Sequence, residues 1–404
     1  MPQEGKDAFL RPLLLALAGC LAAFVVLATP ARAADPYTIE SNIAYGPANA
    51  QKGSNLLDVY VPNAESPRPR PVFVWIHGGG WFTGDKVSST MGYKAKALVD
   101  AGFVFVSINY RLSPDLDGPL ALSRERLRYP TSHQDAARAL GWVNEHIREF
   151  GGNPNRLVIG GDSAGGQISS LLATKPSFLR VEGVSTSQVK GVLSLDAVGF
   201  NVSRMMTPAY KRISAGFQKM MFNAFGTPAE ERANPSWAAA SPIRFAGRTD
   251  PPIFHVVPTS SADRWAEAAR MAKRLGQRFP LVSWRIRTNH PGVVPTLGNP
   301  ANDMGVTVRA IRFVKAAVAT TRFRPVVTGE RTVPTAGAGM TPVRLNVTSS
   351  PVARLVTCRM DGRRETLCPA SWRLARGVHS LRVTTYSNTG KASMSRLVKI
   401  RVVG

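Results

Sequence analysis

Five residues near the middle of the chain, Gly161-Asp162-Ser163-Ala164-Gly165, have the types and spacing of a nucleophilic turn. An apolar run precedes them and a helical pattern follows, so this G-x-S-x-G sequence lies between an expected strand and an expected helix. Such a turn is strained and projects the serine hydroxyl away from the backbone, and it needs small neighbours such as Gly161 and Gly165. Because ordinary glycine-rich loops show the same pattern, partner groups elsewhere in the chain decide whether Ser163 can react.

A serine hydroxyl is a weak nucleophile, and it needs a base, a group that orients the base, and donors that stabilise an oxyanion. The best candidate for the donors is His77-Gly78-Gly79-Gly80-Trp81, which follows an apolar run upstream of Ser163. Its glycines allow the backbone to approach a substrate carbonyl closely. We therefore predict an oxyanion hole made by the backbone amides of Gly79, Gly80 and Ala164.

The base is expected to be a histidine that follows a late strand. His290 alone among the six histidines lies just past the last expected strand. The other five fall in the glycine motif, in expected helices or strands, or near the C-terminus: His77, His133, His146, His255 and His379. We therefore predict that His290 is the general base.

The acid that orients the base is expected between the serine and the histidine along the chain. Asp263 follows the expected strand 253–257 and opens a helical pattern, so we predict that Asp263 is this acid. Asp196, directly after the expected strand 192–195, stays open as the alternative, because some hydrolases place the acid one strand earlier.

The elements that would position these residues alternate along the chain. Apolar runs occupy 71–76, 103–108, 157–159, 192–195, 253–257 and 282–286, and helical patterns occupy 133–150, 164–174, 263–275 and 306–319. This alternation predicts an α/β fold, with a mostly parallel twisted sheet and helices on both faces, over residues 34–323. The polar stretch before it predicts antiparallel edge strands, and the Met- and Phe-rich residues 200–242 predict an insertion that caps the site.

The N-terminus has the pattern of a secretion signal. Basic residues precede an apolar run over 13–27, and Ala31-Arg32-Ala33 matches a cleavage site. The run is too short to predict a comfortable membrane span, so we expect no integral span in the mature chain. The sequence therefore predicts a signal peptide over 1–33 and a secreted or periplasmic protein.

The three cysteines are consistent with export. Leu17-Ala18-Gly19-Cys20 resembles a bacterial lipobox, so a lipid anchor on Cys20 stays open as the less favoured alternative. Cys358 and Cys368 would pair in an oxidising compartment. The expected catalytic region then holds no thiol, which excludes a cysteine nucleophile and a thiolate metal site. We expect no metal and no cofactor.

The chain is strongly basic, with 51 Lys and Arg against 26 Asp and Glu and a formal net charge of +25. No zinc-like Cys/His spacing and no RNA-binding signature accompany this charge, so we expect no nucleic-acid partner. Residues 341–404 contain twelve of the basic residues and two acidic ones, a net charge of +10. An anionic polymer of the cell envelope or its surroundings is the partner that such a charge favours.

The end of the chain changes in composition. Residues 324–340 are rich in Pro, Gly, Thr and Ala and predict a linker, and the alternating residues 341–404 predict a small all-β domain. The spacing of Cys358, Asp361-Gly362, Cys368 and Gly377-Val378-His379 resembles bacterial immunoglobulin-like repeats attached to secreted proteins. This resemblance implies an immunoglobulin-like sandwich.

Residues 45–320 resemble the α/β-hydrolase superfamily, and are most similar to its secreted carboxylesterases with an H-G-G-G-W motif and a G-D-S-A-G-G turn. The stretches Asn109-Tyr110-Arg111-Leu112 and 151–156 add to the resemblance. It implies hydrolysis of carboxylic esters through an acyl-enzyme without a cofactor, and favours small acyl or hydroxycinnamoyl esters. Many members carry H-G-x-x-D in the acid loop, where this chain has 257–263 without that pattern, so the position of the acid is open.

Two other functions stay open. An arylformamidase-type amidase uses similar motifs for the cleavage of formamides. A non-catalytic envelope-binding protein on a hydrolase scaffold would explain the basic charge, although it would not need the serine, histidine and oxyanion motifs together.

Overall fold

The structure is a computed structural model that describes residues 35–49, 51–207, 214–319, 325–335, 339–348 and 355–403. The signal peptide expected over 1–33, including Cys20, lies outside the described residues. Across these described ranges, no helix is both long enough and apolar enough to span a bilayer.

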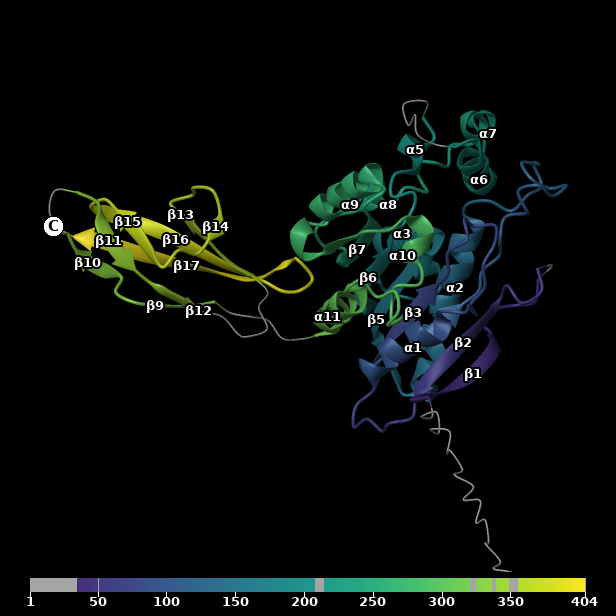
Figure 1. Cartoon of the computed structure of the whole chain (residues 1–404), viewed down its shortest axis with the longest axis horizontal. Coiled ribbons are helices and arrows are strands. Elements are labelled where there is room, and N and C mark those ends of the chain that lie inside the picture. Colours follow the sequence, from purple (N-terminus) through teal and green to yellow (C-terminus); the bar gives the residue numbers. More distant parts are fainter. Residues whose placement is uncertain are drawn as a thin grey trace, which may run out of the picture. The chain divides into compact units, whose positions relative to one another are not determined.

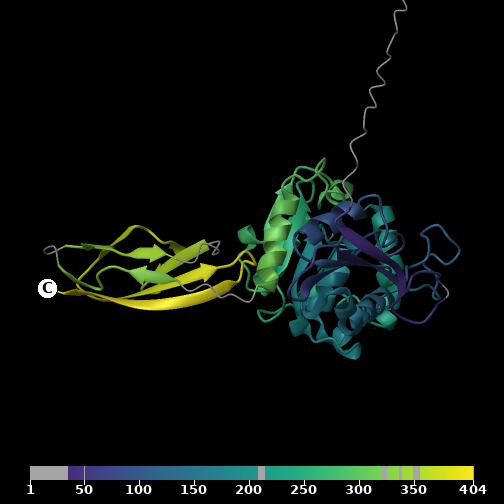
Figure 2. The ribbon, with the colours of Figure 1, turned by 90° about the horizontal axis from the view of Figure 1, so that it is seen from below.

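An eight-stranded sheet forms the centre of the larger domain, in the order β1-β2-β4-β3-β5-β6-β7-β8. Figure 1 and Figure 2 show this sheet from two sides with the helices around it. Its strands are β1 (Tyr37–Ala44), β2 (Leu56–Pro62), β3 (Arg70–Ile76), β4 (Val104–Ile108), β5 (Gly152–Asp162), β6 (Val189–Leu195), β7 (Ile253–Pro258) and β8 (Ser283–Ile286). The pairs β1–β2 and β2–β4 are antiparallel, whereas the other five pairs are parallel. The predicted mostly parallel sheet with antiparallel edge strands is confirmed.

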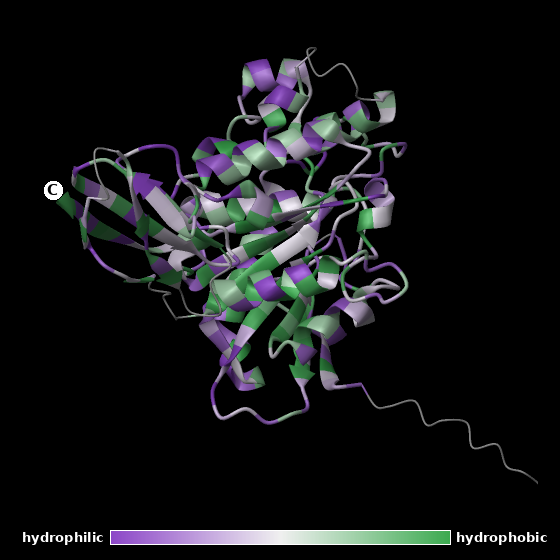
Figure 3. Ribbon diagram, turned by 60° about the vertical axis from the view of Figure 1, so that its left-hand side comes forward, coloured by the Kyte–Doolittle hydropathy of each residue, from purple (hydrophilic) through white to green (hydrophobic). Residues whose placement is uncertain are grey.

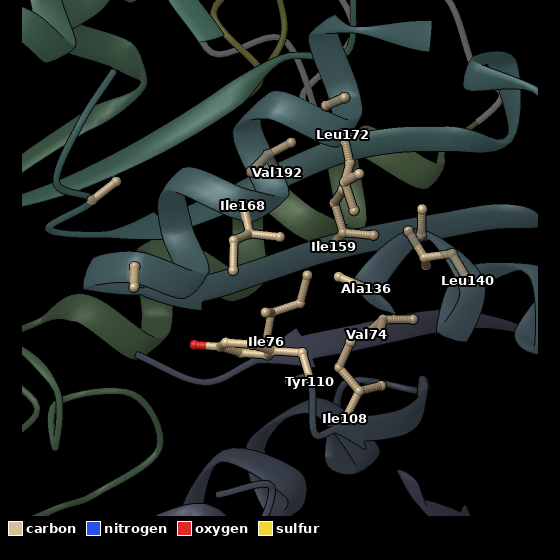
Figure 4. Close-up of a cluster of buried hydrophobic side chains, with 14 of the residues drawn as sticks. Val74, Ile76, Ile108, Tyr110, Ala136, Leu140, Ile159, Ile168, Leu172 and Val192 are labelled. Atoms are coloured by element: carbon tan, nitrogen blue, oxygen red, sulfur yellow. The ribbon is translucent and has the colours of Figure 1, made fainter. Parts of the chain in front are cut away.

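Alternating side chains of the strands build two hydrophobic cores, one on each face of the sheet. In β3, Val74 and Ile76 belong to one core and Phe73 and Trp75 to the other. The first core packs against α2 (Thr131–His146) and α3 (Ser163–Thr174), and the second packs against α1 (Met91–Asp100) and α11 (Val306–Val318). Figure 4 shows residues of the first core converging between β3 and α3. Helices therefore cover both faces, as predicted, and Figure 3 shows hydrophobic colour along the central strands.

Further helices lie between the later strands. The insertion between β6 and β7 contains α5 (Val202–Met205), α6 (Ala215–Phe225), α7 (Pro228–Ala233) and α8 (Pro242–Phe245). The remaining helical elements are α4 (Pro176–Val181), α9 (Ala262–Arg274), α10 (His290–Val293), η1 (Ile147–Phe150), η2 (Thr186–Gln188) and η3 (Phe279–Leu281). The sequence pattern predicted α2, α3, α9 and α11, and it missed α1 and α6.

The C-terminal region is rich in strands and has its own small hydrophobic core. Its strands are β9 (Val326–Thr328), β10 (Thr332–Pro334), β11 (Thr341–Arg344), β12 (Asn346–Thr348), β13 (Leu355–Met360), β14 (Thr366–Leu367), β15 (Ser371–Leu374), β16 (Gly377–Tyr386) and β17 (Ala392–Val403). The five-stranded sheet has the order β10-β17-β16-β13-β14, and β11–β15 and β9–β12 form two-stranded sheets. Strands that alternate buried and exposed side chains confirm the predicted all-β domain. Its immunoglobulin-like character stays a prediction.

Two predictions about this domain can be compared with its disulfide and with its first strands. The disulfide expected between Cys358 and Cys368 is present, with the Cα atoms 4.8 Å apart. The predicted linker 324–340 is partly wrong, because β9 pairs with β12 and β10 pairs with β17 inside this segment. Val327 of β9 is buried in the core of the β domain. Short edge strands such as these give too few alternating residues for a sequence pattern to detect.

Candidate active site

The strand β5 runs directly into α3, and Ser163 occupies the first position of that helix. Ser163 has a φ of +49°, a conformation that non-glycine residues rarely adopt. A Cβ atom on Gly161 or on Gly165 would overlap the carbonyl oxygen of Ile76, so both positions require glycine. The serine is therefore held in the strained turn that the sequence predicts.

The glycine loop after β3 lies beside this turn. Gly79 and Gly80 have φ values of +99° and +60°, and a Cβ atom on Gly79 would overlap the carbonyl oxygen of Thr83. Among the described residues, no backbone carbonyl accepts a hydrogen bond from the amides of Gly79 or Gly80. Ala164 is the second residue of α3, and the first amides of a helix have no acceptor within it. The Tyr110 hydroxyl donates to the His77 carbonyl at 2.9 Å and fixes the start of the loop. These three amides are thus free to donate to a substrate oxygen.

The base and the serine meet across the sheet edge. His290, in α10 after β8, lies with its Nε2 atom 2.9 Å from the Ser163 hydroxyl oxygen. Its Nδ1 atom lies 2.6 Å from Oδ2 of Asp196, which follows β6 directly. An ionised carboxylate only accepts hydrogen bonds, so Nδ1–H donates to Asp196 and Nε2 accepts from Ser163. The three side chains form one hydrogen-bonded series.

The acid in this series is Asp196, so the prediction of Asp263 is wrong. Asp263 lies in the first turn of α9, whose N-cap is Ser261, and the structure gives it no hydrogen bond to His290. The helix dipole stabilises a carboxylate in the first helical turn, and this accounts for the position of Asp263 without a catalytic role. Asp196 instead has a φ of +49° immediately after its strand, which turns its carboxylate toward His290.

The insertion over residues 200–242, which the sequence predicts to be a cap, contacts the glycine loop. Met220 of α6 lies against Gly80, because a Cβ atom on that glycine would overlap its sulfur. The insertion is tied to the segment 113–130, where the buried Arg126 side chain lies 2.7 Å from Glu230 and donates to the Asn223 carbonyl at 3.1 Å. An apolar side chain in this position limits the size of a group that fits beside the Gly80 amide. That residues 200–242 cap the site stays a prediction.

Burial keeps the side chain of His77, at the start of the glycine loop, uncharged. Burial lowers the pKa of His77 to about 4, although its hydrogen bond to the Gly78 carbonyl acts in the opposite direction. The imidazole is therefore neutral near pH 7, and its Nδ1–H donates to that carbonyl at 2.7 Å. Among the described residues, no group of three or more His, Cys, Asp or Glu side chains is placed to hold a metal ion.

A model of the BD-FAE family matches residues 57–266, just over half of the chain. The chain belongs to the BD-FAE family. The matched segment includes the glycine loop, Ser163 and Asp196, and it ends before His290.

Relatives of this BD-FAE chain include described esterases. LipM of Mycobacterium tuberculosis, a probable carboxylic ester hydrolase, is 29% identical over 221 residues, covering 54% of this chain and 47% of LipM. Esterase LipQ of the same organism is 28% identical over 250 residues, covering 57% of this chain and 53% of LipQ. Liver carboxylesterase 1 of Oryctolagus cuniculus is 41% identical over 122 residues, covering 30% of this chain and 20% of that enzyme. The chain spans about half the length of the first two.

Solved structures share the fold. A truncated carbohydrate esterase from gut microbiota superposes with a TM-score of 0.52 at 18% identity, covering 70% of this chain and 98% of its own. A bacterial heroin esterase gives a TM-score of 0.51 at 21% identity, and the match covers 70% of this chain and 84% of that enzyme. Together with the mostly parallel sheet, these similarities establish the α/β-hydrolase fold for the larger domain.

Replacing Gly79 by Ala in this BD-FAE chain should impair an oxyanion hole. The new methyl group would overlap the Thr83 carbonyl oxygen and displace the loop, so its amides would no longer converge. Loss of one such donor costs on the order of 100- to 1,000-fold in kcat. Initial rates on a p-nitrophenyl ester measure the loss. A G53A variant, which also changes a glycine of positive φ but one where the Cβ finds room, is the control.

Glu267 of α9 should make stability depend on pH. Burial raises the pKa of this carboxyl to about 7, and among the described residues its Oε1 atom has no hydrogen-bond partner. The native state then binds more protons than the unfolded state between about pH 4.5 and 7, so stability falls as the pH rises through that window. Above pH 7 the loss in the free energy of unfolding is complete. It amounts to roughly 3 kcal/mol, because each unit of pKa shift corresponds to about 1.4 kcal/mol.

The variant Glu267→Gln removes this titration, because its side chain is neutral at every pH. We expect the Tm of the variant to match that of the unaltered chain at pH 5, and to exceed it by several degrees at pH 8. Thermal melts at both values measure the difference. If the Tm difference between the variant and the unaltered chain were the same at pH 5 and at pH 8, the buried titration of Glu267 would be contradicted.

Proposed function

We propose that this chain is an exported serine carboxylesterase that hydrolyses carboxylic esters through an acyl-enzyme. The observation that carries the proposal is the hydrogen-bonded series Ser163–His290–Asp196, with distances of 2.9 and 2.6 Å, beside three free backbone amides. The family match and the named esterases among the relatives support the same reaction class. A binding protein would not need this series.

In the proposed mechanism, the Ser163 oxygen attacks the ester carbonyl while His290 Nε2 takes the hydroxyl proton. The oxyanion of the tetrahedral intermediate accepts hydrogen bonds from Gly79, Gly80 and Ala164. His290 then donates the proton to the leaving alcohol, and the carbonyl re-forms as an acyl-serine. In deacylation, His290 takes a proton from a water molecule whose oxygen attacks the acyl group. His290 then donates that proton to the Ser163 oxygen, which releases the acid and restores Ser163. Asp196 holds the imidazole in the required tautomer and stabilises the imidazolium.

The test compares ester and formamide substrates. Purified chain is assayed on p-nitrophenyl acetate, butyrate and decanoate, on a methyl hydroxycinnamate and on an N-formylated aromatic amine. Met220, which lies against Gly80, favours small acyl groups, so we expect acetate or butyrate and the hydroxycinnamate to be preferred. Exclusive cleavage of the formamide would establish the arylformamidase-type alternative. No turnover of any substrate would favour a non-catalytic binding protein.

We further propose that the N-terminal segment directs export and is removed after Ala33. Support comes from the apolar run and the A-x-A sequence alone. Expression with the native leader in a bacterium, followed by N-terminal sequencing of the extracytoplasmic protein, tests this. A mature chain beginning at Ala34 is expected. A lipid-modified chain beginning at Cys20 would support the lipobox alternative instead.

The β domain is proposed to retain the enzyme on an anionic, carboxylate-bearing polymer. Support comes from one exposed face of its five-stranded sheet, where Arg359 lies opposite Arg382 and where Lys399 and Arg401 follow on the next strand. Side chains at such register positions share a face, so four cations gather there. Attraction of this kind weakens as salt screens it.

Charge reversal in the full chain tests this retention. We expect R382E/K399E to elute from a polygalacturonate column at lower salt than the unaltered chain. R148E/R180E, which changes two exposed arginines of the larger domain by the same charge, is the control. Equal elution of both variants would leave the β domain as a spacer.

A further inference from the structure

The carboxylate of Asp196 has a second partner besides the histidine. While Oδ2 accepts from His290 at 2.6 Å, Oδ1 accepts from Nε of Arg264 at 2.7 Å. The Asp196 side chain is fully buried and that of Arg264 is 18% exposed. Each oxygen of the buried acid therefore has its own charged or polar donor.

The position of Arg264 is fixed by the element that carries it. It lies in the first turn of α9, where its backbone N–H donates to the N-cap hydroxyl of Ser261. This turn follows β7, the strand next to β6 in the sheet, so the guanidinium approaches Asp196 from the neighbouring strand's loop. The sequence analysis predicts the acid Asp263 in this loop. The loop instead supplies the guanidinium of Arg264 to Asp196, which follows the preceding strand.

The contact constrains the direction in which Asp196 faces. A carboxylate can rotate about its Cβ–Cγ bond, and only a narrow range of rotation places one oxygen in line with the Nδ1–H of His290. A guanidinium N–H is directional, and it stays charged at every working pH, so a bond to Oδ1 fixes that rotation. Without it, Oδ1 would be a buried anionic oxygen lacking a donor, which is costly and favours reorientation.

We propose that Arg264 is a positioning residue of the triad, which acts on the reaction through Asp196 and does not touch the substrate. The inference rests on the proposed function of Ser163, His290 and Asp196. Its consequence is a kinetic effect confined to the chemical steps: removal of Arg264 lowers kcat and leaves KM unchanged. A purely structural role would instead lower the folded fraction, and a substrate-binding role would raise KM.

The test begins with Arg264→Ala in the full chain. We expect kcat on p-nitrophenyl butyrate to fall on the order of 100-fold, the scale for misplacement of a catalytic group, with KM within twofold. Guanidinium ion at millimolar concentration should restore part of this activity, because it can occupy the vacated space beside Oδ1. Arg264→Lys keeps the positive charge but loses the planar guanidinium that directs the bond to Oδ1, and it should be only partly active. R270A, which removes an exposed arginine from the same helix, should keep full kcat.

A double-mutant cycle separates action through Asp196 from every other role. In D196N the orientation of the acid no longer matters, so adding R264A should cause no further fall in kcat. Activity of the unaltered chain and circular-dichroism melts of all variants accompany the cycle. An inactive unaltered chain would refute the proposed function. An active one, with R264A at full kcat or with R264A lowering kcat equally in both backgrounds, would overturn the role of Arg264 alone.

Discussion

Asp196→Asn should lower kcat by about 10,000-fold while leaving the fold intact. The amide can donate to Nδ1 of His290, which stabilises the wrong tautomer, and it cannot stabilise the imidazolium that forms as Ser163 attacks. The loss should be confined to turnover, because Asp196 is buried and does not reach the substrate. Steady-state kinetics on a p-nitrophenyl ester, with circular dichroism as the check on folding, measure it.

Asp263→Asn is the matched control, because it removes one carboxylate from the neighbouring loop. Its kcat should stay within a few-fold of the unaltered value, and its main effect should be a small loss of helix stability, about 0.3–1 kcal/mol. The opposite ranking, with D263N inactive and D196N active, would require a rearranged acid loop in solution and would contradict the geometry at His290.

Ser163→Ala should lower kcat by on the order of a million-fold, the loss seen when a serine hydrolase loses its nucleophile. The oxyanion amides and the binding surface remain in this variant, so a small residual rate above water is expected. Because the position has a φ of +49°, alanine keeps the same backbone strain that serine has. Single-turnover measurements with a chromogenic ester detect the loss of the acylation burst.

Ser163→Gly is the companion variant, since glycine adopts this φ without strain. We expect it to be as inactive as S163A and at least as stable. Turnover that persists in both variants at more than a thousandth of the normal rate would show that another nucleophile acts, and would contradict the role of Ser163.

The parts of the site that the sequence predicts are those whose chemistry is contiguous along the chain. The turn around Ser163 and the glycine loop each show their requirement for small residues within five positions, because a Cβ atom there would meet backbone. His290 is recognisable because it follows the last strand of the sheet. For these residues, local sequence and the order of strands suffice.

The acid and its partner could not be predicted in this way. Asp196 and Asp263 follow successive strands, and in the structure the positive φ after β6 and the hydrogen bond to His290 identify Asp196 as the partner of the base. A stronger signal was available: Asp196 directly follows its strand, at the edge where catalytic groups of parallel sheets gather, whereas Asp263 lies five residues beyond β7. Arg264 gave no signal, because its contact joins two loops that are far apart in sequence.

The fold shows the same division between local and distant information. The buried strands and the amphipathic helices were predicted from their apolar patterns. The helix α1 was missed because it buries Lys94 at a position where an apolar residue would be expected. Burial lowers the pKa of this lysine to about 8. The edge strands β9 and β10 were missed because pairing with β12 and β17, rather than their own composition, makes them strands.

The most direct test of the central claim is covalent labelling with a fluorophosphonate probe, followed by mass spectrometry of the labelled peptide. The geometry predicts one probe per chain, attached to the Ser163 oxygen, because only a serine activated by His290 and faced by an oxyanion hole reacts in this way. Labelling should disappear in S163A and slow greatly in D196N, whereas D263N should label at the normal rate. An unlabelled chain that is correctly folded, or a label on any residue other than Ser163, would contradict the assignment.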